Sequence, residues 1–201
     1  MFSKLPTSFY ERDDVVTIAR ELLGKVLVTK INNTVTAGII VETEAYRGES
    51  DLACHACVYG KTERTKIMFG KPGHAYIYLC YGIHHLFNVV TNKEGFADAV
   101  LIRAIEPIAG IDTMLLRRNK TVLNRSVGGG PGIVSSALGI TTKLYGTNLQ
   151  ESTIWLEDRE TYFEDSSIIA SPRVGVNYAG NDAHLPWRFR VKGNAYTSPA
   201  K

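Results

Sequence analysis

The chain has 201 residues, of which 44% are hydrophobic and 21% are charged, and its formal net charge is +3. These values are typical of a folded globular chain rather than a disordered one, and the length suggests a single domain over residues 1–201. No apolar run approaches the roughly 20 residues of a membrane span, and the N-terminus shows no signal peptide, so we expect a soluble cytoplasmic protein that contacts no membrane.

One helix and two strands are predicted for the first quarter of the chain. Asp13 and Asp14 can cap a helix that runs to about Leu23, and Gly24 then ends it. Residues 25–29 and 35–46 are rich in β-branched side chains, which favours strands.

The middle of the chain predicts a short helix, a hairpin and one more strand. The helix is expected over residues 62–69. Residues 74–81 and 84–91 read as two strands joined by a tight turn at Gly82, so together they predict a β-hairpin. Residues 99–104 read as the next strand.

Two helices and three short strands are predicted for the remainder. Pro107 is expected to open a helix that runs to about Arg118. A glycine-rich turn at 128–132 leads into a second helix that ends near Gly139. The predicted strands are 154–156, 173–176 and 187–192. The whole chain is therefore expected to be an α+β domain dominated by antiparallel sheet.

Two glutamates and a tyrosine stand at alternating positions of the 35–46 strand. Side chains alternate between the two faces of a strand, so Glu42, Glu44 and Tyr46 share one face. A solvent-facing surface would explain them, but Ile39–Val41 is apolar at every position, which favours a central strand. Because glutamates are rarely buried unless they are paired, we predict that one of the two has a functional role.

Aromatic side chains recur along the predicted hairpin. Tyr76 and Tyr78 share one face of its first strand, and core packing is a sufficient explanation for both. Tyr81 falls beside the turn, where a side chain projects from the tip and core packing is a poor explanation. Aromatic residues with basic neighbours suit the stacking of nucleic-acid bases.

Basic residues are concentrated in the middle of the chain. Residues 61–145 carry 11 basic and 5 acidic groups, which suits a face that attracts nucleic acid, although ordinary surface mixing is the alternative. The predicted strand 187–192 alternates apolar and basic side chains, so Arg188, Arg190 and Lys192 form one row. That row is expected to be either a solvated edge or a phosphate-facing surface.

Two further patterns, the spacing of the cysteines and a glycine-rich turn, are candidate sites for a metal ion and for a phosphate. Cys54 and Cys57 have the spacing of zinc ligands, but Cys80 and the histidines near it supply no matching pair, so we expect no metal site. The glycine-rich turn 128–132 could hold a phosphate on its backbone N–H groups, or could be a plain turn. It lacks the Gly-Lys-Ser/Thr of a nucleotide-hydrolysing P-loop.

Several segments, taken in order over about residues 9–198, resemble one family. The main motifs are V-E-T-E-A-Y-R-G at Val41, M-F-G-K-P-G-H-A-Y-I-Y at Met68, L-C-Y-G-I-H-H-L-F-N-V-V-T at Leu79, V-L-I-R-A-I-E-P at Val100 and G-P-G-I-V-S-S-A-L-G-I at Gly130. Together they resemble the alkylpurine (3-methyladenine) DNA glycosylases of the alkyladenine type, in their bacterial form. The resemblance implies a curved, open-barrel-like antiparallel sheet with surrounding helices and a protruding hairpin that probes the DNA minor groove.

The resemblance also implies an activity and its catalytic residues. The enzyme would flip alkylated or deaminated purines (3-methyladenine, 7-methylguanine, ethenoadenine or hypoxanthine) out of double-stranded DNA and hydrolyse the N-glycosidic bond without cleaving the strand. Glu44 matches the general base, and Arg103 matches the arginine that helps to hold the attacking water. No cofactor and no metal are implied, and a monomer is expected.

Other residues match the family's DNA-binding positions. Tyr46, His55 and Tyr78 match the side chains that sandwich the flipped base. Asn88 matches the asparagine that excludes the exocyclic amine of guanine, and Tyr81 matches the tyrosine that fills the gap left in the duplex. The side chains expected to contact the DNA backbone are Arg64, Lys66, Arg188 and Arg190. The chain departs from the family at Ile133, where a lysine is common.

Three alternatives remain open from the residues themselves. They are a non-catalytic nucleic-acid-binding domain, a metal-dependent hydrolase that uses the cysteines, and a sugar glycosidase that uses Glu42 and Glu44. A carboxylate at Glu44 gives no advantage to a protein that only binds phosphates. Carboxylates at positions i and i+2 of a strand lie side by side, which suits a glycosidase poorly.

Overall fold

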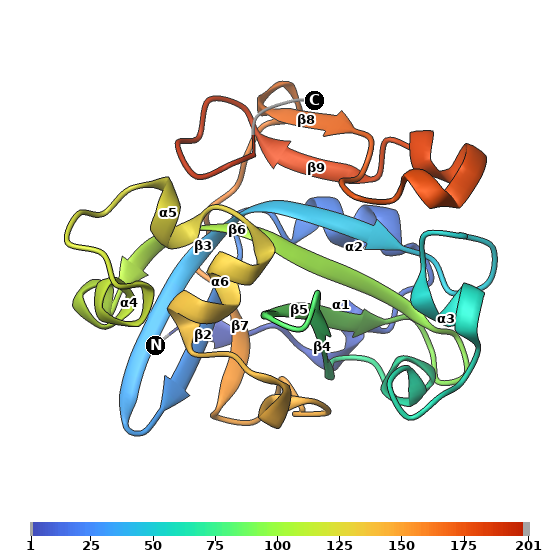
Figure 1. The fold of residues 1–201 in the computed structure, drawn as a ribbon, viewed down its shortest axis with the longest axis horizontal. Coiled ribbons are helices and arrows are strands. Elements are labelled where there is room, and N and C mark those ends of the chain that lie inside the picture. Colours follow the sequence, from blue (N-terminus) through green and yellow to red (C-terminus); the bar gives the residue numbers. More distant parts are fainter. Residues whose placement is uncertain (1, 199–201) are drawn as a thin grey trace.

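A curled antiparallel sheet of nine strands organises residues 2–198, which are the residues that the computed structural model describes (Figure 1). The strands are β1 (Ser3–Lys4), β2 (Val26–Ile31), β3 (Thr34–Tyr46), β4 (Ala75–Cys80), β5 (His84–Thr91), β6 (Asp98–Ala109), β7 (Ile154–Asp158), β8 (Ile168–Ser171) and β9 (Arg188–Val191). Their order in the sheet is β1-β7-β2-β3-β6-β5-β4, with β9 paired to β3 and β8 paired to β9. The predicted α+β class with a curved antiparallel sheet is confirmed.

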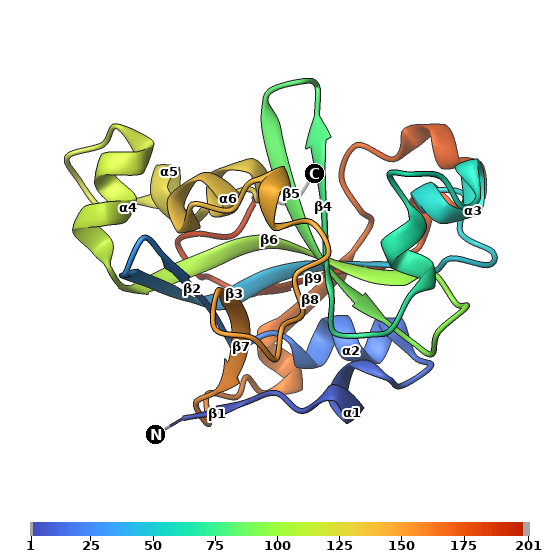
Figure 2. The ribbon, with the colours of Figure 1, turned by 90° about the horizontal axis from the view of Figure 1, so that it is seen from below.

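Helices cover both faces of this sheet. They are α1 (Thr7–Tyr10), α2 (Val15–Glu21), α3 (His55–Tyr59), α4 (Ile111–Arg118), α5 (Arg125–Gly128) and α6 (Pro131–Leu138), with 3-10 turns η1 (Lys66–Phe69), η2 (Thr142–Leu144), η3 (Asp165–Ser167) and η4 (Asn177–His184). Figure 2 shows α1 and α2 on one side of the sheet, and the hairpin of β4 and β5 projecting on the other side beside α6. Among residues 2–198, no helix has the length and apolar character needed to cross a membrane.

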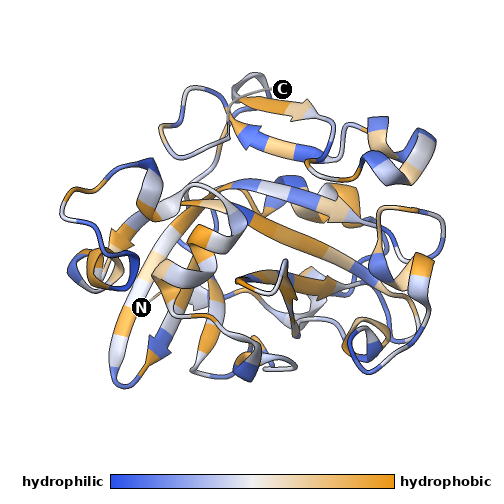
Figure 3. Cartoon of the chain, viewed as in Figure 1, coloured by the Kyte–Doolittle hydropathy of each residue, from blue (hydrophilic) through white to orange (hydrophobic). Residues whose placement is uncertain are grey.

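Strand β3 lies at the centre of the sheet, as its apolar run predicted. Its first half pairs with β2, and its second half pairs with β9, while β6 runs along the other edge. Every residue from Val41 to Ala45 is completely buried. The buried face of α2 covers one side and that of α6 the other, and Figure 3 shows β6 as hydrophobic over most of its length. The two glutamates of β3 are therefore enclosed in the protein rather than exposed on a strand surface.

Local sequence signals located several elements correctly. Helix α2 begins after Asp14, whose carboxylate accepts the backbone N–H groups of Val16 and Thr17 at 3.0 and 3.1 Å. Strands β4 and β5 pair as a hairpin along their whole length. The helix expected at 62–69 is only the single 3-10 turn η1, with a hydrogen-bonded turn before it.

The helix predicted to open at Pro107 is wrong. Strand β6 continues through Pro107 to Ala109, and α4 begins only after Gly110, whose φ of 69° is left-handed. Strand β5 pairs with β6 no further than Leu101. Beyond that point one edge of β6 has no strand neighbour, so a proline that lacks an N–H group is tolerated.

The strand predicted at 173–176 is also wrong. The strand in this region is β8, which ends at Ser171. Arg173 is instead held in irregular backbone by its own side chain, which is described with the site below. A short β-branched stretch therefore forms no strand where side-chain contacts set the backbone conformation.

Candidate active site

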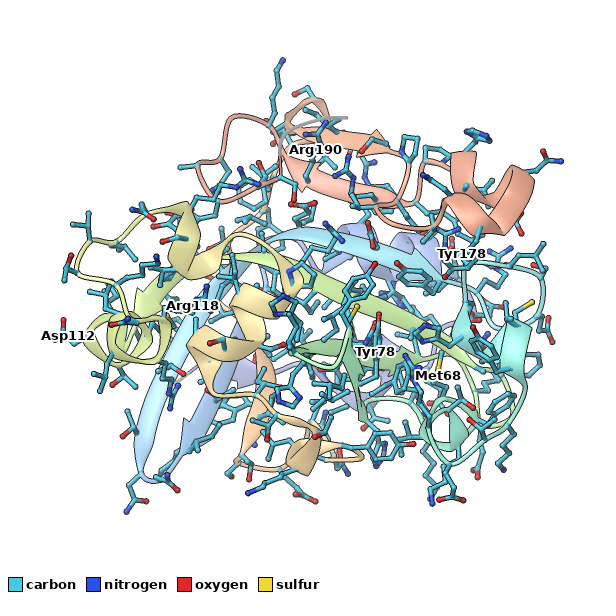
Figure 4. All side chains as sticks on the ribbon, viewed as in Figure 1. Met68, Tyr78, Asp112, Arg118, Tyr178 and Arg190 are labelled. Atoms are coloured by element: carbon cyan, nitrogen blue, oxygen red, sulfur yellow. The ribbon has the colours of Figure 1, made fainter. Side chains whose placement is uncertain are left out.

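A cavity of about 520 Å³ lies between the β4–β5 hairpin, the ends of β3 and β6, and the segment around Val174. Figure 4 labels three of the residues that line it, Met68, Tyr78 and Tyr178. Eight of the residues singled out from the sequence line the same cavity: Glu44, Tyr46, His55, Arg64, Tyr78, Tyr81, Asn88 and Arg103. Residues separated by up to 59 positions in the sequence thus meet in one place.

Glu44 is completely buried in the wall of this cavity. One carboxylate oxygen accepts the hydroxyl of Tyr46 at 2.7 Å, and the other accepts the backbone N–H of Val174 at 2.8 Å. The guanidinium of Arg103 lies 3.3 Å from the second oxygen. All three contacts stabilise negative charge on the carboxylate.

Arg103 bridges the two buried glutamates. Its Nε donates to Glu42 at 3.0 Å while its terminal nitrogen faces Glu44. Burial alone would lower the pKa of Arg103, but the charges of Glu44 and Glu42 outweigh burial and raise it. The guanidinium therefore stays charged and holds the two carboxylates together.

A β-bulge lies at Arg103, at the wall of the cavity. Glu42 pairs with Ala104 and Thr43 pairs with Ile102, so Arg103 is the additional residue of β6 between these two pairs. A bulge changes the direction of a side chain and is common next to active sites. Ala99, Leu101 and Arg103 all line the cavity, as alternation along β6 would place them, whereas the bulge itself has no signal in the sequence.

Glu42 shares the strand face of Glu44 but does not line the cavity. It lies behind Arg103, where it also accepts the backbone N–H of Ser198 at 2.7 Å and faces Arg188 at 3.6 Å. Glu44 is thus the glutamate that lines the cavity, and Glu42 is part of its support.

The opposite side of the cavity is aromatic. The rings of His55 and Tyr78 meet edge to face with centroids 4.7 Å apart, and His55 Nδ1 is hydrogen-bonded to the hydroxyl of Tyr76 at 2.9 Å. Burial, with a smaller contribution from the charge of Arg64, lowers the pKa of His55 from 6.5 to about 4. His55 is therefore neutral at pH 7.

Tyr46 and Asn88 have fixed orientations. Burial first, and then the charge of Glu44, raises the pKa of Tyr46, so its phenol stays protonated and donates to Glu44. The side-chain amide of Asn88 donates to the backbone carbonyl of Tyr76 at 3.1 Å and to that of Leu86 at 3.4 Å. These bonds determine which way the amide faces at the cavity wall.

Tyr81 projects from the tip of the hairpin, as its position beside the turn predicted. It is 89% exposed, and its φ of 51° lies in the left-handed region. A residue other than glycine adopts this region at a cost of about 1–3 kcal/mol. An exposed aromatic ring on a strained tip contributes little to the core.

The expected basic row on the last strand is wrong. Strand β9 lies between β3 and β8, so it is not an edge. Arg188 is 1% exposed and donates to Ser171, and Arg190, labelled in Figure 4, is 6% exposed and donates to the carbonyl of Ser198. Neither arginine therefore belongs to an exposed row on the outer surface.

The other two expected backbone contacts have different surroundings. The guanidinium of Arg64 lies over the ring of Tyr78, 4.7 Å from its centroid, at the cavity mouth. Lys66 is exposed and pairs with Glu63 at 2.6 Å. Both remain accessible to a DNA strand.

Two backbone N–H groups of the glycine-rich turn already donate hydrogen bonds within the protein. The N–H group of Gly130 donates to the carbonyl of Arg103, and that of Gly129 donates to the carbonyl of Arg125. These two donors do not serve a phosphate. Pro131, the first residue of α6, lines the cavity.

The sequence did not predict the ion pair between Arg173 and Asp51, which lies next to Val174 and which we call the Arg173 clamp. The guanidinium of Arg173 pairs with both oxygens of Asp51 at 2.5 and 2.8 Å, and it also donates to the carbonyls of Ala45 and Asp182. It lies over the ring of Tyr46, 4.9 Å from the centroid. Asp51 and Arg173 are 122 positions apart and belong to no local pattern, so no signal in the sequence could have paired them.

The cysteines show no sign of a shared site. All three are free thiols, and burial raises the pKa of Cys54 to about 12. Within residues 2–198, no three His, Cys, Asp or Glu side chains gather in a way that could hold a metal ion.

Comparison with known proteins agrees with this geometry. The family described as methylpurine-DNA glycosylase (MPG) matches residues 8–195. A protein of Bacillus cereus strain AH187, named as a 3-methyladenine DNA glycosylase, is 43% identical over 96% of this chain and 98% of its own length. Proteins with the same name from Bacillus thuringiensis strain Al Hakam and Bacillus cereus strain G9842 are 43% and 44% identical over the same shares. The chain therefore belongs to the methylpurine-DNA glycosylase family of DNA N-glycosylases.

Proposed function

We propose that this glycosylase acts in base-excision repair on damaged purines in double-stranded DNA and hydrolyses their N-glycosidic bond with a water activated by Glu44. The observation that carries the proposal is a buried carboxylate, held by Arg103 and Val174, in the wall of an aromatic cavity. The names of the relatives favour 3-methyladenine as one substrate. The proposed range also includes 7-methylguanine, ethenoadenine and hypoxanthine.

The base must leave the duplex before water can reach C1′ of its sugar. Extrusion costs a few kcal/mol, and less for a damaged base. Tyr81 is the side chain that fills the vacated position, because it is exposed at the tip of the projecting hairpin. Stacking on an aromatic ring is worth about 1–3 kcal/mol per base, which offsets much of that cost.

The extruded base enters the cavity beside Tyr46, His55 and Tyr78. Many alkylated purines carry a positive charge, and aromatic faces attract cations. Since His55 is neutral at pH 7, it does not repel such a base. Asn88, fixed by the hairpin backbone, opposes the exocyclic amine of undamaged guanine, whereas the positive charge of 7-methylguanine weakens its glycosidic bond enough for release despite this opposition.

Hydrolysis follows from the position of Glu44. The water oxygen bonds to C1′ while the C1′–N bond breaks, the bonding pair leaves with the purine, and Glu44 accepts a proton from the water. The carboxylate also opposes the positive charge that develops on the sugar. Arg103 keeps the carboxylate in place and helps to hold the water. No amine nucleophile takes part, so the strand is left uncleaved.

The test is single-turnover release of base from a duplex that contains one 3-methyladenine or one hypoxanthine. Glu44→Gln keeps the size of the side chain but removes its charge and basicity, so we expect the rate to fall by about 10²–10⁴-fold while lesion binding persists. Glu106→Gln is the matched control, because Glu106 lies on β6 outside the cavity and binds Asn194. A folded Glu44→Gln protein that releases base at the wild-type rate would exclude Glu44 as the base.

A further inference from the structure

A second cavity, of about 640 Å³, adjoins the first. Four arginines line it, Arg103, Arg125, Arg173 and Arg188, and we call it the arginine cavity. None of the described residues that line it is an aspartate or a glutamate. Such a lining is suited to an anion.

Two of the four arginines are already balanced by carboxylates outside the cavity. Arg173 forms its bidentate pair with Asp51, and Arg103 bridges Glu42 and Glu44. The remaining two, Arg125 and Arg188, have no carboxylate of their own among residues 2–198.

Arg188 is a buried cation with incomplete pairing. It donates through Nε to the hydroxyl of Ser171 at 3.2 Å, and its terminal nitrogen lies 3.6 Å from Glu42. Glu42 is already engaged by Arg103 at 3.0 Å and by the backbone N–H of Ser198. Burial lowers the pKa of Arg188, which is the effect of a desolvated charge that its neighbours do not fully compensate. A buried charge is costly unless it is paired, so an anion in the cavity would stabilise this site.

Arg125 offers a second cation at the rim. It is the first residue of α5 and is exposed, and within residues 2–198 its guanidinium makes no hydrogen bond or ion pair. A guanidinium presents donors in a planar fork that matches the oxygens of a phosphate group. One arginine at the floor and one at the rim can thus hold a single phosphate between them.

The two cavities have a common wall. Arg103, Val174 and Gly175 line both of them, and Val174 is the residue whose N–H group binds Glu44. A nucleotide whose base enters the first cavity carries a phosphate on each side of its sugar. A phosphate held in the arginine cavity would keep that sugar against the wall where Glu44 lies, and fixed positioning of this kind accelerates a reaction.

We propose that the arginine cavity is a phosphate subsite, in which Arg188 and Arg125 hold one of the two phosphodiester groups that flank the extruded nucleotide. This inference rests on the proposed function. It differs from the exposed basic row expected from the sequence, because the phosphate is taken into a cavity next to the reacting sugar.

The test uses lesion duplexes in which one flanking phosphate at a time is replaced by a neutral methylphosphonate. Binding is measured for the wild-type protein, for Arg125→Gln, and for Arg12→Gln as a control. Arg12 lies in the link between α1 and α2, which Figure 2 shows on the other side of the sheet from α5. At one of the two positions, we expect the neutral linkage to weaken wild-type binding by about tenfold to a hundredfold. Arg125→Gln should lose part of this factor with ordinary DNA, and the neutral linkage should then cost the variant clearly less than it costs the wild type, because only Arg188 still contacts the phosphate.

Two further readouts separate the subsite from the proposed function. The log–log salt slope of binding should fall by about 0.9 in Arg125→Gln and stay unchanged in Arg12→Gln. In the absence of DNA, inorganic phosphate at constant ionic strength should raise the unfolding temperature of the wild type more than that of Arg125→Gln.

Results that would overturn the phosphate subsite differ from those that would overturn the proposed function. Independent, multiplicative losses from the variant and from the neutral linkage at both positions would overturn the subsite, even if base release is normal. An inorganic phosphate effect without the coupling would show a site for free anions only, and would overturn the assignment to the DNA backbone. Absence of base release, with the phosphate effect and the coupling intact, would overturn the proposed function but leave the subsite standing.

Discussion

Glu42 and Glu44 are two positions apart, yet their surroundings give them different tasks. Both are completely buried, but Glu44 lines the cavity, whereas Glu42 lies among Arg103, Arg188 and the backbone of Ser198. Alternation along the strand put both on one face, and only their contacts distinguish them. Glu42 is consequently a poor choice as an inert control for Glu44.

Replacement of Glu42 tests this supporting role. Glu42→Gln leaves two buried arginines short of a carboxylate, and removal of one partner from a buried ion pair costs about 3–5 kcal/mol. We therefore expect a decrease of this order in the free energy of unfolding, measured by urea denaturation. Glu106→Gln should change that free energy far less, because Glu106 is only half buried. Equal stability of the two variants would contradict the role assigned to Glu42.

His55 makes the stability of the protein depend on pH. Its pKa is lowered from 6.5 to about 4, by burial and then by Arg64. Between these two values the unfolded chain binds a proton that the folded chain does not, so stability must fall as the pH falls from 6.5 towards 4. His55→Gln should lose less stability over this interval than the wild type does, as measured by urea denaturation at several pH values.

The control for this pH effect is another histidine of the chain. His84 is exposed at the start of β5, so His84→Gln should keep the wild-type dependence on pH. If His55→Gln and the wild type lose the same free energy between pH 6.5 and 4, the proton is taken up elsewhere.

At the scale of elements, the hairpin of β4 and β5 is the part expected to enter the DNA. Tyr81→Ala removes an exposed ring, so the unfolding free energy should change little while affinity for a lesion duplex falls about tenfold to a hundredfold. Fluorescence anisotropy with a labelled duplex measures the affinity.

The neighbouring tip residue supplies the control for Tyr81. Ile83 is 71% exposed on the same loop, and Ile83→Ala removes apolar surface without removing an aromatic ring. A similar loss of affinity in both variants would point to general contact of the tip rather than to insertion of Tyr81.

Strands β3 and β6 show what local patterns can and cannot predict at this scale. Alternation correctly put Glu42 and Glu44 on one face because that part of β3 is extended. The same reasoning could not predict the bulge at Arg103, because it forms only when β6 pairs with β3. The helix predicted to open at Pro107 is wrong for a related reason. A proline is acceptable in β6 only where its pairing with β5 has already ended, and the sequence does not show where that pairing ends.

At the scale of the whole molecule, the charge distribution predicts the response of DNA binding to salt. The buried arginines of β9 are removed from the outer surface, so we expect exposed basic residues of the 61–145 region, such as Arg64 and Lys66, to supply the surface contacts. Each neutralised phosphate contributes about −0.9 to the log–log slope of affinity against salt. We expect a clearly negative slope between 50 and 200 mM salt, the range over which such contacts act. A slope of zero, measured by titration of a lesion duplex, would contradict surface binding of the backbone.

The sequence by itself determined much of the fold class and most of the candidate site. Local signals such as the Asp14 cap, the hairpin turn and the β-branched runs act between close neighbours, so they are readable without a structure. The motifs that resemble one family also indicated eight residues that meet in the cavity. Their separate positions along the chain, however, did not show how they contact one another.

Only the tertiary structure decided the features that depend on distant contacts. The N–H group of Val174 on Glu44, the clamp of Arg173 on Asp51 and the burial of Arg188 each join segments more than 100 positions apart. An alternating basic strand looks the same in sequence whether it is an edge or is covered. Here β8 and β3 pair with both edges of β9, and Arg188, which could have faced solvent, instead lines a cavity. The strands that pair with a given strand, and the side chains that cover it, depend on the whole fold, because distant segments of the chain supply them.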